Sequence, residues 1–150
     1  MSETETPWYA DAVMPAVLDA ARRGYGRSMR RALEAAGYDD MPRVGMRLIG
    51  GIANNGPAGP DVARHLGVRG ERAQRLIEVL VERQYAAVQT TTSNEPHYVL
   101  TDRGRAAAEV MAAAREEFEQ QVIGRVGSGD FATTRAVLGA MIALTDDASA

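Results

Sequence analysis

Two short helical patterns separated by a glycine constrain the fold of this chain more than any other feature. The first begins at Pro60, a residue that suits the first turn of a helix, and stops at Gly67. The second runs from about Arg69 to Gln84, and its apolar residues recur at intervals of three and four, as on the buried side of an amphipathic helix. Two helices joined by so short a turn are typical of the helix-turn-helix motif.

The sequence that follows changes from a helical to a β-strand pattern. The runs YAAVQT (85–90) and HYVL (97–100) favour strands, and the polar segment TTSNEP (91–96) between them favours a turn. A small hairpin directly after a helix-turn-helix is typical of a winged helix. We therefore expect a mainly α fold with a small β wing, in which the winged helix-turn-helix occupies about 43–101.

Long helical patterns flank this segment. The expected helices outside the helix-turn-helix are Trp8–Ala36, Arg43–Asn54, Asp102–Val126 and, after a break at GSGD (127–130), Phe131–Leu144. The chain has 150 residues, of which 45% are hydrophobic, so a single globular domain is expected over 1–150. The apolar stripes of the flanking helices, about 8–37 and 102–145, are wide for so small a core. A two-fold homodimer built through these dimerisation helices would bury them.

The composition excludes several classes of protein. The chain has no cysteine, which excludes disulfides and thiolate metal sites. His65 and His97 lie on different elements without a second ligand nearby, so no metal and no cofactor are expected. No nucleophile–base set or glycine-rich phosphate loop is present, and the chain is not expected to be an enzyme. Without a secretory-signal pattern or a long apolar span, we expect a cytoplasmic protein that has no contact with membranes.

The segments DVARHLGVRGERAQRLIEVLVERQYA (61–86) and YVLTDRGR (98–105) carry a resemblance to a known family. With the Leu-Thr-x-x-Gly step at Leu100, Thr101 and Gly104, and with the order and lengths of the helices, the sequence resembles the MarR family of transcriptional regulators. The resemblance covers nearly the whole chain. It implies a homodimer that binds a pseudo-palindromic operator in double-stranded DNA, and a repressor that is released by a small aromatic or anionic effector.

Six residues are candidates for contacting DNA. Arg69 and Arg72 belong to the first turn of the second helix of the motif, whereas Gln74 and Arg75 lie on its outer side. Arg64 could reach a phosphate, and His97 in the wing a phosphate or the minor groove. Seven arginines and six acidic residues between 61 and 105 leave a net charge of +1 there, against −3 for the chain. Alternatively, Arg75 pairs with Glu71 along a solvated helix, and His97 is an exposed strand residue.

A second group of candidates could bind an effector. The resemblance places an effector pocket where the dimerisation helices meet the winged helix, and the aromatic and apolar residues expected there are Trp8, Tyr25, Met29, Met46, Ile49 and Met111. Such a stripe is more often simply core. An arginine cluster at 22–31 could hold an anion or a DNA backbone, or form a solvated face with the pairs Asp19–Arg23 and Arg30–Glu34.

Two functions of different classes remain open. The first is a dimeric, ligand-responsive transcriptional regulator that binds DNA. The second is a ligand- or protein-binding module of the same fold whose DNA binding is weakened or lost. The second interpretation rests on the wing, VQTTTSNEPHYV (88–99), which has no basic residue other than His97, and on Gly70 at the start of the second helix of the motif.

Overall fold

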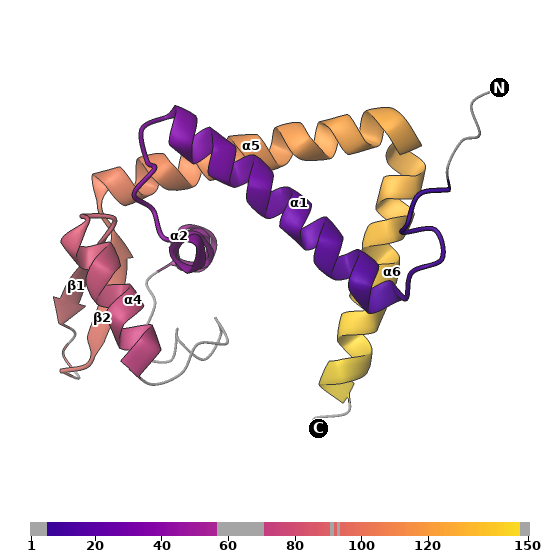
Figure 1. The fold of residues 1–150 in the computed structure, drawn as a ribbon. Helices are drawn as coiled ribbons and strands as arrows, with labels where there is room; N and C mark the ends of the chain where they lie inside the picture. The colour runs from indigo at the N-terminus through magenta and orange to yellow at the C-terminus, as the bar shows by residue number, and fades with distance from the viewer. Residues whose placement is uncertain (1–5, 57–70, 91, 93, 148–150) are drawn as a thin grey trace. The chain divides into compact units, whose positions relative to one another are not determined.

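The computed structural model describes residues 6–56, 71–90, 92 and 94–147. Its elements, labelled as in Figure 1, are α1 (Met14–Ala35), α2 (Arg43–Asn55), α4 (Glu71–Glu82), β1 (Ala86–Thr90), β2 (Pro96–Leu100), α5 (Asp102–Val126) and α6 (Ser128–Asp147). The expected helix at 60–67 lies outside the described residues, as do the candidate DNA contacts Arg64 and Arg69. The chain divides into two compact units, Met1–Ala114 and Arg115–Ala150, which are described separately below.

The first helix, α1, begins later than the sequence suggests. The expected start at Trp8 is wrong, because α1 begins at Met14 with Pro15 in its first turn, where the missing N–H of proline costs nothing. The helix then continues through Gly24 and Gly26 without a break. It ends at Ala35, and the φ of +84° at Gly37 lets the N–H of Tyr38 reach the carbonyl of Leu33 at 2.8 Å, a Schellman-type cap.

The wing is a two-stranded antiparallel hairpin. Its register pairs Ala86 with Leu100 at the base and Thr90 with Pro96 near the tip. In the turn, Asn94 has a φ of +60°, a conformation that asparagine tolerates better than most residues. The hairpin lies beside α4 and α2 (Figure 1), and strand β2 leads directly into α5. The predicted fold class, mainly α with a small β wing, is therefore confirmed.

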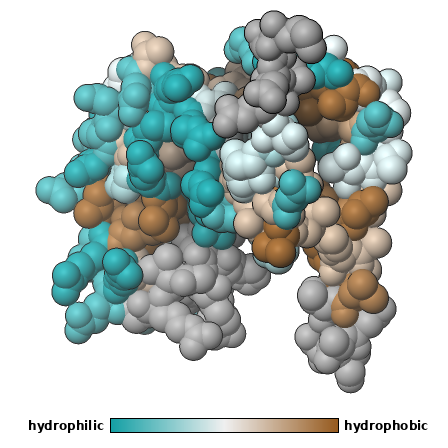
Figure 2. All heavy atoms as spheres, turned by 45° about the vertical axis from the view of Figure 1, so that its right-hand side comes forward, coloured by the Kyte–Doolittle hydropathy of each residue, from teal (hydrophilic) through white to brown (hydrophobic). Residues whose placement is uncertain are grey.

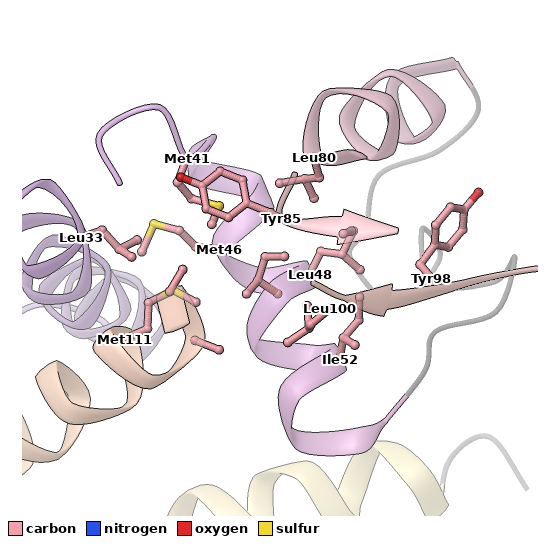
Figure 3. Packing of buried hydrophobic residues seen from close by; sticks show 14 of the residues in the cluster. Leu33, Met41, Met46, Leu48, Ile52, Leu80, Tyr85, Tyr98, Leu100 and Met111 are labelled. Atoms are coloured by element: carbon pink, nitrogen blue, oxygen red, sulfur yellow. The ribbon is translucent and has the colours of Figure 1, made fainter. Parts of the chain in front are cut away.

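A hydrophobic cluster of the described residues holds the first unit together. Its most deeply buried large side chains come from α1, α2, α4 and the segments next to them, and are Leu33, Met41, Leu48, Ile49, Leu80 and Tyr85. Figure 3 shows Met111 of α5 and Leu33 of α1 on one side of this cluster, and Leu100 of the wing on the other. The cluster therefore fixes α4 and the wing to the α1 and α2 helices and to the first turns of α5.

The second unit contains α5 from Arg115 onward and the whole of α6. The expected start of the last helix at Phe131 is wrong: only Gly127, with a φ of +89°, interrupts the helix, and α6 begins at Ser128. Asp130 then lies in the first turn, where a negative charge suits the helix dipole. In the single chain α6 exposes a row of apolar side chains, Val137, Met141, Ile142 and Leu144, along a surface with brown patches in Figure 2. No described helix is both long and apolar enough to span a bilayer.

Candidate nucleic-acid interface

Helix α4 has one buried and one exposed side, as its periodicity predicts. Ala73, Ile77 and Leu80 are buried against the core, so the helix is fixed by its apolar side. The candidate DNA contacts Arg72, Gln74 and Arg75 are all exposed, together with Glu71 and Glu78. The core therefore presents the polar side of α4 to solvent, where a nucleic acid can reach it.

The exposed polar side chains of α4 pair with one another along the helix. Arg75 lies 3.4 Å from Glu71, and Gln74 donates a hydrogen bond to Glu78 at 3.0 Å. The side chains of Arg75 and Glu71 are 76% and 90% exposed, so this ion pair contributes only a few tenths of a kcal/mol. A well-placed contact between arginine and a base edge is worth about 1–3 kcal/mol. The pair therefore does not prevent Arg75 from binding DNA.

The wing offers little positive charge to a phosphate backbone. His97 is half-buried on β2, opposite Gln89 on β1, and does not stand free at the tip. Exposed residues near the tip include Thr90, Asn94 and Glu95. Of the predicted DNA contacts that the structure describes, Arg72, Gln74 and Arg75 lie together on α4, whereas His97 lies on β2.

Hydrogen bonds of Thr101 tie the segment that follows α4 to the start of α5. Thr101 accepts a hydrogen bond from the N–H of Gly104 at 3.0 Å and so caps α5. Its hydroxyl donates to the carbonyl of Gln84, and its N–H donates to the carbonyl of Tyr85 at 3.2 Å. Gln84, whose carbonyl accepts the hydrogen bond from the Thr101 hydroxyl, has a φ of +61°, a backbone conformation that is uncommon for residues other than glycine. The Leu-Thr-x-x-Gly step thus connects the start of α5 to the segment that follows α4, a contact called here the joint between α4 and α5.

A cluster of polar side chains lies at the same joint, and the sequence analysis did not predict it. Asp40, Tyr85 and Arg103, here called the Asp40 cluster, come from three segments that no motif or periodicity connects. The Tyr85 hydroxyl donates to Asp40 Oδ1, and Arg103 donates to the same oxygen at 3.0 Å and to the Tyr85 hydroxyl at 3.1 Å. The hydrogen bond from Tyr85, followed by the charge of Arg103, holds the pKa of Asp40 below its ordinary value despite partial burial.

The candidate effector residues divide into two groups. Met46, Ile49 and Met111 are buried in the core cluster, and Met29 packs against it. These four residues lie close together, but as packed neighbours within the core. The alternative given for this apolar stripe, that it is simply core, describes them. Tyr25 is half-buried on α1. Trp8 lies before α1 instead of on a helix, is 62% exposed and stacks edge-on against Tyr9, with the ring centroids 6.0 Å apart.

Two arginines of the α1 cluster pair with an acidic residue of the same helix. Arg22 and Arg23 both pair with Asp19, which includes the expected pair Asp19–Arg23. Arg30 donates to the carbonyl of Met41 at 2.6 Å instead of pairing with Glu34. The described residues hold no group of three or more His, Asp and Glu side chains arranged to bind a metal ion.

Comparison with known proteins was informative for structures only. No protein-family model and no curated protein sequence matches the chain. A MarR family transcriptional regulator from Silicibacter pomeroyi superposes with a TM-score of 0.74 at 18% identity, over 94% of this chain and 95% of that one. MepR, a transcription regulator of the Staphylococcus aureus multidrug efflux pump MepA, superposes with a TM-score of 0.66 at 14% identity, over 89% and 99%.

The regulator NadR is similar in two states. Its ligand-free structure has a TM-score of 0.74 at 16% identity, over 93% of this chain and 100% of NadR. Its complex with 4-hydroxyphenylacetate has a TM-score of 0.69 at 15% identity, over 94% and 96%. These likenesses extend over almost the full length of each protein. The chain has the winged-helix fold of MarR-family transcriptional regulators.

Proposed function

We propose that this protein is a dimeric transcriptional regulator that binds double-stranded DNA through α4. The observation that carries the proposal is the exposed polar side of α4, with Arg72, Gln74 and Arg75, on a helix whose other side is fixed in the core. Helices presented in this way read base edges in the major groove. The structures reported above belong to transcriptional regulators, which supports the same role for this chain.

The apolar surface of the single chain supports the proposed dimer. Val137, Met141, Ile142 and Leu144 of α6 are 39–72% exposed, and Trp8, Tyr9, Val13 and Met14 at the beginning of the chain are 53–71% exposed. Exposed apolar patches of this kind mark interaction surfaces. A second copy of the chain is the proposed occupant, because two-fold pairing would also place two α4 helices against the two halves of a pseudo-palindromic operator.

A small aromatic or anionic effector is the proposed signal, and repression the proposed mode of action. The complex of NadR with 4-hydroxyphenylacetate shows that this fold can bind such a molecule. In this chain the proposed contacts are Trp8, Tyr25, Met29, Met46, Ile49 and Met111. Since three of these are buried in the core, an effector would have to displace core neighbours, and binding would then change the packing that supports α4.

Substitution of Arg75 tests the proposal. Operator sequences are first selected from random DNA with the purified full-length protein, and binding of Arg75→Ala is then measured at several salt concentrations. We expect a loss of about 1–3 kcal/mol per half-site and a salt slope lower by about one for each phosphate contact removed. Arg115→Ala removes an exposed arginine of α5 and is the matched control. If Arg75→Ala binds the operator as tightly as Arg115→Ala does, α4 does not contact DNA as proposed.

The alternative, a binding module without DNA recognition, is favoured by one observation. The wing has no lysine or arginine, and the chain as a whole carries a net charge of −3. Electrostatic attraction to DNA is therefore weak for a protein of this fold. If selection from random DNA returns no enriched sequence at low salt, this alternative replaces the regulator.

A further inference from the structure

The Asp40 cluster joins three segments that are distant in sequence. Asp40 lies between α1 and α2, Tyr85 lies three residues after the end of α4, and Arg103 lies in the first turn of α5. One carboxylate oxygen accepts hydrogen bonds from both Tyr85 and Arg103. The guanidinium carbon of Arg103 lies 4.6 Å from the centroid of the Tyr85 ring, a cation–π distance.

Tyr85 is held at both of its ends. Its ring is fully buried in the core, beside Met41 in Figure 3, and its hydroxyl extends to Asp40 at the edge of the core. Its carbonyl accepts the N–H of Thr101, at the start of α5. Because hydrogen bonds hold both its side chain and its backbone, Tyr85 has little freedom to move. The position of Tyr85 therefore fixes the course of the chain after α4.

The cluster sits on the boundary between core and solvent. The side chains of Asp40 and Arg103 are each 39% exposed, so their ion pair contributes little to the stability of the fold. A polar interaction that adds little stability can still favour one arrangement of the packed segments over others. Arg83 adds a further link, because it donates a hydrogen bond to the carbonyl of Asp40 from the segment that follows α4.

We propose that Asp40, Tyr85 and Arg103 form a positioning cluster that fixes the orientation of α4 relative to the first turns of α5. This inference rests on the proposed function, because orientation matters if two α4 helices of a dimer must meet two half-sites at once. Successive half-sites lie about 34 Å apart, one helical turn of DNA, and an α4 helix that rocks on its core would tolerate other spacings. The three residues are positioning residues that have no proposed contact with DNA.

The test compares Tyr85→Phe with Tyr98→Phe in the full-length protein. Tyr85→Phe removes the hydroxyl that Asp40 binds and keeps the buried ring. Tyr98 is also buried, at 6% exposure, but lies on β2 away from Tyr85 and Met41 in Figure 3, so the same substitution there is the matched control. Arg103→Gln serves as a second variant that removes the cation, and both variants are checked for a folded state by circular dichroism.

Two readouts are measured. The first is affinity for the selected operator and for versions with one base pair inserted or removed between half-sites. We expect Tyr85→Phe and Arg103→Gln to weaken binding of the best operator by about tenfold and to reduce the penalty for altered spacing, whereas Tyr98→Phe changes neither. A uniform loss of stability would lower affinity for all spacings equally. An unchanged spacing preference in both variants would overturn the inference, while loss of binding in Arg75→Ala would still support the proposed function.

The second readout does not require DNA. Amide hydrogen exchange is measured over 71–90 and 101–110 in the free protein, and we expect faster exchange in both segments of Tyr85→Phe and Arg103→Gln than in Tyr98→Phe. If no DNA binds even the parent protein, this measurement decides the positioning role by itself. Exchange equal to that of Tyr98→Phe in both segments would show that the cluster does not position α4.

Discussion

Gly104 makes a close backbone contact where the segment after α4 meets the start of α5. A Cβ atom built on Gly104 would lie 1.9 Å from the carbonyl oxygen of Tyr85 and 3.0 Å from its carbonyl carbon. These are backbone atoms, so no side-chain rotation can relieve the clash. Because Thr101 caps α5 at the same place, the helix cannot move away without losing its cap. The glycine of the Leu-Thr-x-x-Gly step is therefore required by contact and not by backbone conformation.

Gly104→Ala should destabilise the protein strongly. Overpacking a tight contact costs about 1–3 kcal/mol or more, a large part of the roughly 5–15 kcal/mol by which a domain is stable. Gly50→Ala in α2 is the matched control, because a Cβ atom there meets nothing within 4 Å; alanine should leave stability unchanged or raise it by about 0.5–1 kcal/mol. Urea unfolding of both variants checks this. Equal midpoints would show that the joint can open to accept a methyl group.

Asp40 should contribute to stability in a manner that depends on pH. Its pKa in the folded protein is lowered from 3.8, first by the hydrogen bond from Tyr85 and then, against partial burial, by the charge of Arg103. A lowered folded pKa adds stability that is present above the ordinary pKa and is lost as the pH falls through the folded pKa. Burial, and then the hydrogen bond to Asp40, raises the pKa of Tyr85, so the Tyr85 hydroxyl remains protonated over this range.

We therefore expect the stability difference between the parent and Asp40→Asn to be constant near neutral pH and to shrink below about pH 4. Since Asp40 is 39% exposed, the difference should be on the order of 1 kcal/mol or less after solvent screening. Urea unfolding of both proteins at a series of pH values measures it, and the other carboxylates cancel in the comparison. A difference as large at about pH 3 as near neutral pH would contradict the assignment of Asp40 as the titrating group.

At the scale of the elements, the sequence was a good guide wherever one period dominates. The apolar repeat of α4 identified its buried side, and the change of period after Gln84 identified the hairpin. The ends of helices were less predictable, because one residue decides them: Pro15 starts α1 late, and Gly127 alone separates α5 from α6 although GSGD reads as a longer break. Helix boundaries depend on such local choices more than on composition.

The site was predictable only where it lies on one helix. Arg72, Gln74 and Arg75 follow from the period of α4 and from the position of its buried side. The Asp40 cluster does not, because Asp40 and Arg103 are 63 positions apart and are brought together by packing of the core. Three-dimensional contacts between different elements leave no spacing in the sequence from which they could be read.

The wing should be the element whose charge limits DNA binding. Glu95 is exposed near the tip, where a negative charge would repel phosphate. Replacing it by arginine should tighten operator binding and steepen the log–log salt slope by about one for each new phosphate contact, so by about two in a dimer. Glu116→Arg, at an exposed position of α5, makes the same change in net charge and is the control. Equal affinities and slopes for the two variants would mean that the wing stays clear of the duplex.

At the scale of the whole molecule, the apolar surface of the single chain requires an explanation. In the first unit Trp8 and Val13 are exposed by 62% and 71% although a core cluster is present, and in the second unit α6 leaves Ile142 and Leu144 exposed by 63% and 72%. The sequence pattern of the last helix placed Val137, Leu138, Met141 and Ile142 on one apolar stripe. Such a pattern cannot say whether the surface that covers the stripe belongs to the same chain. An obligate two-fold interface of roughly 2,000 Å² or more would cover these side chains.

The parent protein should therefore have twice the 16.1 kDa mass of the chain when measured by light scattering at micromolar concentration. Met141→Glu should lower the soluble yield or unfold the protein, because obligate dimers often have no stable folded monomer. Leu138→Glu should act in the same way. Ala136→Glu, at an exposed position of α6 about 140° around the helix from Met141, adds the same charge and should leave the dimer intact.

A monomeric mass for the parent would contradict the dimer, and a well-folded monomer from Met141→Glu would show that the interface is not obligate. Because a pseudo-palindromic operator needs two α4 helices at a fixed separation, such a monomer should also lose most of its specific DNA binding even though Arg75 is intact.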